Sequence, residues 1–447
     1  MRDLLLMSIV VAACLVTLKR PWVGVMLWTW LSLMNPHRYT YGFAYSAPLA
    51  QMAALSTFVG LLLTRDLRQQ PFRGTPLGLF GLFVVWITLS WLLGNDVQGD
   101  YEQWKKIMKI DLMLLIGVVL LHDKKHILAL MWVSAGSLAV LGAKGGLFTI
   151  LTGGGNRVWG PPGSFIEDNN EFALSLVMTI PLLRFLQLQL SNKWGRHLMT
   201  VSMLLLAAAA LGSHSRGGLL ALLAMAVLFW WRGRSRIIGG AVMLTAGLVA
   251  LSFMPAEWFE RMETINTYEQ DRSALGRFSA WWVAWGIGKS HLFGVGFSAA
   301  KGYLFEAFSP YGLEFGTPVA HSIYFQVMGH HGFIGLAIFL SIWAVSYLWA
   351  GRIRKEAKGI PQARWCIDLA NMCQVSLVGY LIGGAFLSLA YFDLPYIIMV
   401  AVVLTRVWVR TKGWEREPAV TPGWRTIPGV IQPPGPGAAA PVRPGLP

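Results

Sequence analysis

Charged residues are scarce in this sequence. Asp, Glu, Lys and Arg make up 13% of its 447 residues, whereas a soluble domain usually carries about 25%. Hydrophobic residues make up 55% and the mean hydropathy is +0.52, which excludes an ordinary soluble domain and predicts an integral membrane protein. There are only three cysteines. Cys14, Cys366 and Cys373 stand in or beside apolar segments without the spacing of metal ligands, so we expect no disulfide and no metal site.

Apolar runs approaching the length that crosses a bilayer, roughly 20 residues, recur as far as about residue 410. We predict an all-α polytopic membrane protein with about 12 transmembrane helices, in which residues 4–34 form a single broken crossing. The candidate spans are 4–17, 22–34, 47–64, 77–94, 110–121, 127–147, 170–188, 197–212, 217–231, 237–254, 320–349, 368–390 and 393–410.

The formal net charge of +15 does not indicate binding of nucleic acid, because most Lys and Arg residues stand in short loops. The basic loops are RDLRQQPFR, HDKKH, NKWGR, RGRSR and GRIRKEAKG, and the positive-inside rule places them in the cytoplasm. The opposite connections, 95–109, 148–169, 213–216 and 255–319, then face the outside. Residues 413–447 form a Pro- and Gly-rich tail, which we expect to be a disordered cytoplasmic extension.

The connection 255–319 is too long for a simple loop, so we expect it to fold as a helical element on the outer membrane surface. Its second half, DRSALGRFSAWWVAWGIGKS, has the composition of a helix. The tryptophans Trp281, Trp282 and Trp285 favour a position at the headgroup interface.

Four cations break the positive-inside pattern on the outer side: Lys144, Arg157, Arg216 and Arg277. Glycines accompany two of them and permit close approach of a bulky ligand. The planar guanidinium group binds phosphate oxygens through paired charge-assisted hydrogen bonds. Taken singly, each arginine fits equally well a side chain that reaches the lipid headgroups.

The segment AHSIYFQVMGHHGFIGL carries three histidines at the edge of an apolar run. If His321 converges with Arg216 and Arg277, the three form a titratable group beside a diphosphate clamp. His330 and His331 lie roughly 13 to 15 Å deeper along the helix axis. We interpret those two as packing residues.

The pieces SHSRGG, GRFSAWWVAWGIGKSHLFGVGF and AHSIYFQVMGHHGFIGL, in this order, resemble the bacterial O-antigen ligases and the related O-antigen polymerase-like enzymes. The pieces NPHRYTYGFAY and KGGLFTILTGGGNRVWGPPGSFIEDNNEFA are similar to a branch of O-glycosylation ligases. Many relatives have Asn after the motif histidine, where this chain has Ser322.

The resemblance implies a metal-independent, lipid-linked glycosyltransferase without a cofactor, in the bacterial inner membrane, formed by residues 1–412. Its donor is polysaccharide on undecaprenyl diphosphate and its acceptor is a sugar hydroxyl of the lipid A core, on the periplasmic face. His321 is then the general base. Arg216 and Arg277 bind the leaving diphosphate, with Arg157 and Lys144 as helpers. Direct attack predicts inversion at the anomeric carbon.

Lys105, Lys106 and Lys109 stand in YEQWKKIMKID, on the predicted outer side, and we interpret them as contacts for phosphates of an anionic lipid acceptor. Three alternatives stay open: an O-antigen polymerase, a ligase for protein hydroxyls, and a polyprenyl-sugar transporter. A transporter predicts ionisable residues near the membrane midplane between repeated halves. The outer-face cations and the lack of an obvious repeat favour an enzyme.

Overall fold

The structure is a computed structural model that describes residues 1–64, 75–232, 236–252, 254–263 and 272–416. These residues form helices and connecting segments and no β-strand. The first ten helices are α1 Arg2–Lys19, α2 Pro21–Met34, η1 Pro36–Tyr39, η2 Phe43–Tyr45, α3 Leu49–Leu63, α4 Pro76–Leu92, α5 Tyr101–Leu120, α6 Lys124–Leu151, α7 Asn169–Gln189 and α8 Lys193–Gly212. The remainder are α9 Arg216–Arg232, α10 Arg236–Ser252, α11 Ala256–Glu263, α12 Arg272–Ser290, α13 Gly302–Phe308, α14 Ile323–Glu356, η3 Pro361–Ala363, α15 Arg364–Gly383, η4 Gly384–Phe386, α16 Asp393–Arg410 and η5 Gly413–Glu415.

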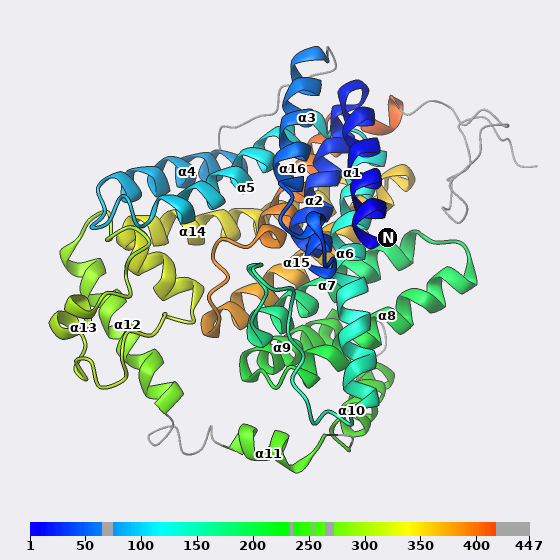
Figure 1. The fold of residues 1–447 in the computed structure, drawn as a ribbon. Coiled ribbons are helices and arrows are strands. Elements are labelled where there is room, and N and C mark those ends of the chain that lie inside the picture. Colours follow the sequence, from blue (N-terminus) through cyan, green and yellow to red (C-terminus); the bar gives the residue numbers. More distant parts are fainter. Residues whose placement is uncertain (65–74, 233–235, 253, 264–271, 417–447) are drawn as a thin grey trace, which may run out of the picture.

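Helices α7 and α16 form the centre of the molecule, and nearly every residue along them is buried. A helix that is apolar on all sides requires packing partners on all sides. Helix α7 packs against α6, α8, α9 and α15, while α16 packs against α5, α6, α14 and α15. Helix α4 packs against α14 and against α5, and α12 packs against α14 and against α13 (Figure 1).

Among the described residues, five helical segments are long and apolar enough to cross a membrane: Lys124–Leu151, Asn169–Gln189, Lys193–Gly212, Ile323–Glu356 and Pro361–Phe386. Four shorter apolar helices accompany them: Pro21–Met34, Leu49–Leu63, Pro76–Leu92 and Arg216–Trp231. Many large apolar side chains on these helices are exposed, such as Leu62 and Leu204, as a lipid-facing surface requires. The chain is therefore an all-helical membrane protein, while the count of 12 spans stays a prediction.

The first 34 residues form two antiparallel helices, so the expected single broken crossing is wrong. The Asp3 carboxylate accepts hydrogen bonds from the backbone N–H groups of Gly42 and Ala44, at 3.0 and 3.1 Å. The start of α1 therefore lies beside the segment that follows α2. Pro21 explains the reversal, because a proline lacks an N–H group and keeps the preceding residue, Arg20, out of the helical region.

The described part of the connection 255–319 forms the helices α11, α12 and α13, as its length and composition predict. The expected helix at 271–290 is α12. Most of the Pro- and Gly-rich tail, residues 417–447, lies outside the described residues, so its predicted disorder stays untested.

Candidate functional site

Helix α14 is broken at Gly332, and the break connects the histidine helix to the GVGF segment, residues 294–297. Gly332 has φ 69° and ψ −175°, a conformation essentially restricted to glycine. Three carbonyl groups at the break accept new donors: Gly329 from the N–H of Val295 at 3.2 Å, His330 from the N–H of Gly296 at 3.1 Å, and His331 from Nε1 of Trp86 at 2.9 Å. The break is thus fully hydrogen-bonded and fixes the direction of the first half of α14.

His330 and His331, which directly precede the break at Gly332, both contact a buried tyrosine. The Tyr391 hydroxyl lies 2.8 Å from Nδ1 of His330 and 2.8 Å from Nε2 of His331. The Phe297 ring stands edge-on to both imidazoles. This environment agrees with a packing role for the two histidines.

Trp281 holds α12 against the residue before His321. Its Nε1 donates to the Ala320 carbonyl at 2.7 Å, and its ring stacks on Phe325 with centroids 4.8 Å apart. Trp282 and Trp285, by contrast, are 52% and 42% exposed. The tryptophans therefore differ in role, and Trp281 sets the spacing between α12 and the start of α14.

His321 lies where α12, α14 and the start of α7 meet. Its backbone φ is 43°, in the left-handed region that few non-glycine residues occupy. The imidazole Nδ1 is 3.9 Å from Oε1 of Glu171, and the two side chains are 31% and 8% exposed. His321 also interacts electrostatically with Arg277 of α12 and with Asp168, the N-cap residue of α7. The structure thus brings Arg277 and His321 together and adds two carboxyl groups.

The charges around His321 act on it in opposite directions. Burial lowers the pKa of His321, the Arg277 cation lowers it further, and the Asp168 carboxylate opposes them. Burial by itself would raise the pKa of Asp168, but hydrogen bonds from the Glu171 carboxyl and from both Asn170 amides lower it overall. His321 is therefore held as the neutral imidazole near pH 7, the form that accepts a proton.

Arg216 begins α9 at the tight SHSRGG turn, which is tied to the start of α7. His214 has φ 57°, and its Nε2 lies 2.7 Å from the Gly154 carbonyl. Nδ2 of Asn169 donates to the Ser213 carbonyl at 2.6 Å, which ties the turn to the first residue of α7. A Cβ at Gly217 would contact Phe386 and Leu387, and the next residue, Ser388, donates its backbone N–H to Glu171 at 3.3 Å. Arg216 is therefore placed near Glu171 through its neighbours in the chain.

Lys144 and Arg157 occupy separate positions. The Lys144 ammonium group lies 4.8 Å from the centroid of the Tyr39 ring. Arg157 is exposed, and the backbone of the following residue, Val158, bonds to the Gly212 carbonyl at 3.1 Å. Arg157 thus lies near the SHSRGG turn, whereas Lys144 lies near η1.

The three lysines of α5 divide into two kinds. Lys105 pairs with Glu102 at 2.8 Å. Lys106 and Lys109 instead line a cavity of about 790 Å³ between α2, α3 and α5, and Lys106 also lies over the Phe165 ring at 3.9 Å.

A group of possible metal ligands lies at the start of α6, where we expected no metal site. The ligand atoms of His122, Asp123 and His126 lie within 4.8 Å of one another. Asp123 and His126 also form a capping box with the first turn of α6. This hydrogen bonding gives two of the three side chains a structural role.

Two site features could not be assigned from the sequence. Asp168 and Glu171 stand in an obvious polar patch, IEDNNEF, but nothing local shows that they adjoin His321. Ser322, which replaces the usual Asn, is buried, and its hydroxyl has no hydrogen-bond partner among the described residues. The substitution therefore does not preserve a side-chain hydrogen bond there.

Two family models match the chain. Residues 1–192 match a family of unknown function (DUF5935), and residues 201–340 match the O-antigen ligase family. The second match contains Arg216, Arg277 and His321. The match supports a ligase- or polymerase-like glycosyltransferase activity, in keeping with the helical membrane fold. The match confirms the resemblance to the O-antigen ligase-like superfamily. No curated protein matches the chain.

Proposed function

We propose that the protein transfers polysaccharide from undecaprenyl diphosphate to a sugar hydroxyl of the lipid A core, and that His321 is its general base. The observation that carries the proposal is the position of His321 within the O-antigen ligase match, beside Arg277 and Asp168. A neutral imidazole next to a phosphate-binding cation suits transfer from a lipid diphosphate.

In the proposed reaction, the acceptor hydroxyl oxygen attacks the anomeric carbon while its proton passes to His321. The bond from that carbon to the diphosphate oxygen breaks, and undecaprenyl diphosphate leaves with the electron pair. One carbon–oxygen bond forms and one breaks, so a single displacement inverts the anomeric configuration.

Negative charge develops on the leaving diphosphate, and fixed cations stabilise such charge most where water is excluded. We assign this role to Arg277 and Arg216, with Arg157 as a helper near the same turn. We assign Lys144, whose ammonium group lies over the Tyr39 ring, a lesser helping role. In this proposal the arginines carry the charge stabilisation that makes the reaction metal-independent.

The proposed site faces the periplasm of the bacterial inner membrane. The support is the distribution of basic loops, which puts the SHSRGG turn and the connection 255–319 on the outer side. The lipid tail of the donor then lies in the bilayer, beside exposed apolar side chains.

The test uses purified full-length protein, undecaprenyl-diphosphate-linked polysaccharide and lipid A core. We expect a ladder of polysaccharide-bearing lipid A core on a gel that requires the added acceptor, and an inverted linkage by NMR. Retention of configuration would refute the single displacement. Chain growth from the donor alone would identify a polymerase, the main alternative, and transfer only to a protein hydroxyl would identify an O-glycosylation ligase.

A further inference from the structure

A large cavity is lined by residues other than His321. It has a volume of about 790 Å³ and is bordered by α2, α3, α5, the 163–166 loop and the start of α16. Cavities of this size hold ligands. We call it the α3–α5 groove.

One side of the α3–α5 groove is apolar and opens toward the surface. Leu49, Ala54, Leu55 and Phe58 of α3 contribute to its lining, and Leu55 is 68% exposed. In a membrane protein, such a surface suits a hydrocarbon chain that lies in contact with the bilayer.

The opposite side carries two cations on one helical face. Lys106 and Lys109 are three residues apart on α5 and both line the groove. Arg38 adds positive charge near Lys106, while Asp393 and Glu167 add negative charge. Glu102 also lines the groove, but it is paired with Lys105.

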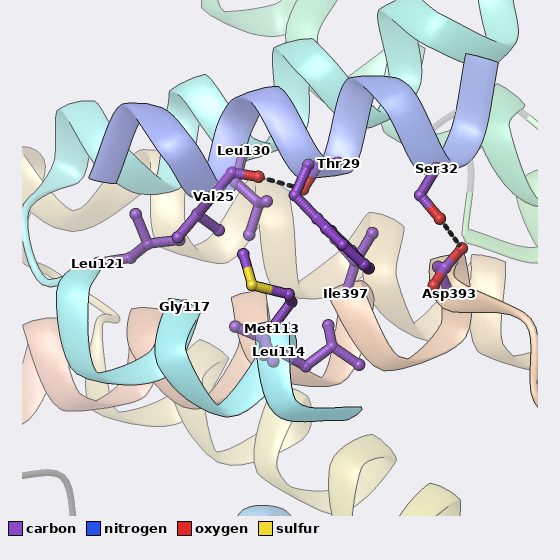
Figure 2. Close-up of a pocket in the computed structure, with 12 residues that line it drawn as sticks. Val25, Thr29, Ser32, Met113, Leu114, Gly117, Leu121, Leu130, Asp393 and Ile397 are labelled. Carbon is purple, nitrogen blue, oxygen red and sulfur yellow. Dashed lines mark hydrogen bonds between the residues drawn. The ribbon is translucent and has the colours of Figure 1, made fainter. Parts of the chain in front are cut away.

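The acidic end of the groove is partly hydrogen-bonded, because Oδ1 of Asp393 is buried and has no hydrogen-bond partner among the described residues. The Asp393 carboxylate accepts from the Ser32 hydroxyl at 2.6 Å, and both residues also line a small, mainly apolar pocket between α2, α5 and α16 (Figure 2). Lys106 and Lys109 are the two ammonium groups of the lining, and they are the groups that can attract an anion there.

The groove shares a wall with the candidate active site. Phe165 and Ile166 line the groove, and Asp168, which interacts with His321, follows two residues later. Two residues of extended chain span about 7 Å. The wall of the groove at Phe165 and Ile166 therefore lies close to the candidate active site.

We propose that the α3–α5 groove binds an acylated, phosphate-bearing lipid, with the hydrocarbon chain along α3 and the phosphate on Lys106 and Lys109. The identification of this lipid as the acceptor rests on the proposed function. Its sugar hydroxyl then extends past the 163–168 wall to His321. Of the three lysines of α5 that the sequence assigns to acceptor phosphates, only Lys106 and Lys109 then bind the phosphate.

The binding test uses purified full-length protein in detergent and fluorescent phosphatidic acid, compared with diacylglycerol of the same chains. We expect tighter binding of phosphatidic acid and at least a tenfold weakening in the double variant Lys106→Gln and Lys109→Gln. Lys105→Gln is the matched control and should change binding less than twofold. Ala54→Phe, which fills the apolar side without altering charge, should also weaken binding. Apparent Tm values confirm that each variant is folded.

Equal binding of phosphatidic acid by the wild type and the double variant would overturn the inference, as would equal loss in Lys105→Gln. Displacement by millimolar inorganic phosphate would show a free-anion site instead of a lipid site.

Transfer kinetics separate this inference from the proposed function. The double variant should raise the acceptor KM at least tenfold, while the donor KM and the kcat at saturating acceptor stay unchanged. If the wild type binds phosphatidic acid through the two lysines but transfers nothing to lipid A core, the groove stands and the proposed function fails. If transfer occurs but the double variant leaves the acceptor KM unchanged, the proposed function stands and the assignment of the groove to the acceptor fails.

Discussion

His321 combines a left-handed backbone, partial burial and two neighbouring charges of opposite sign. A left-handed conformation costs a non-glycine residue about 1 kcal/mol, which the hydrogen bond from Trp281 to Ala320 and the packing of α12 offset. The cost is consistent with an imidazole that must point in one direction. Such strained residues concentrate at active sites.

The pH dependence of transfer should reveal the two charges separately. A general base works only when neutral, so kcat/KM should fall on the acid side at a pH below the ordinary histidine pKa of 6.5. Arg277→Gln removes a charge that lowers this pKa, so its acid limb should move to higher pH. Asp168→Asn removes a charge that raises it, so its limb should move to lower pH. Identical limbs in all three proteins would show that His321 is not the titrating group.

At the scale of elements, the break in α14 orients the histidine helix. A Cβ at Gly332 would lie 2.4 Å from the Leu292 carbonyl oxygen, and its φ and ψ are open essentially to glycine alone. The same loop donates two hydrogen bonds into the break through Val295 and Gly296. Hydrogen bonds therefore join α12, the GVGF segment and the start of α14.

Gly332→Ala should destabilise the protein by about 1–3 kcal/mol and reduce transfer. Gly359→Ala is the control, because Gly359 also has a positive φ, of 82°, but no atom lies within 4 Å of its added Cβ. Apparent Tm in detergent and the transfer rate provide the measurements. Equal effects of the two substitutions would mean that the close approach of Gly332 to the Leu292 carbonyl contributes nothing to stability or to transfer.

The sequence predicts elements better than contacts. Apolar runs located α6, α7, α8 and α16 closely, because a helix in lipid must be long and apolar. The same pattern could not show the reversal at Arg20, since a short hydrophobic pair of helices and one broken span have the same composition. From the sequence, His321 is placed beside Arg277 only on the condition that the two segments converge. Its position 3.9 Å from Glu171 joins residues far apart in the chain, which no local pattern indicates.

At the scale of the whole molecule, the basic loops predict one orientation for all helices. Gly195 in NKWGR should face the cytoplasm, and Gly312, between α13 and α14, should face the periplasm. Cysteines placed at these two positions test the orientation with a membrane-impermeant maleimide. Gly312→Cys should react in intact spheroplasts and Gly195→Cys only after lysis. The opposite result would place His321 on the cytoplasmic side and exclude a periplasmic acceptor.

The central claim is that His321 and Arg277 carry out the transfer. The most direct measurement is the single-turnover rate of transfer from undecaprenyl-diphosphate-linked polysaccharide to lipid A core. His321→Ala and Arg277→Gln should each lower the rate about 100-fold or more. His197→Gln should leave it unchanged, because His197 is exposed near the start of α8, the end opposite the SHSRGG turn. A folded His321→Ala protein that transfers polysaccharide within a few-fold of the wild-type rate would contradict the account.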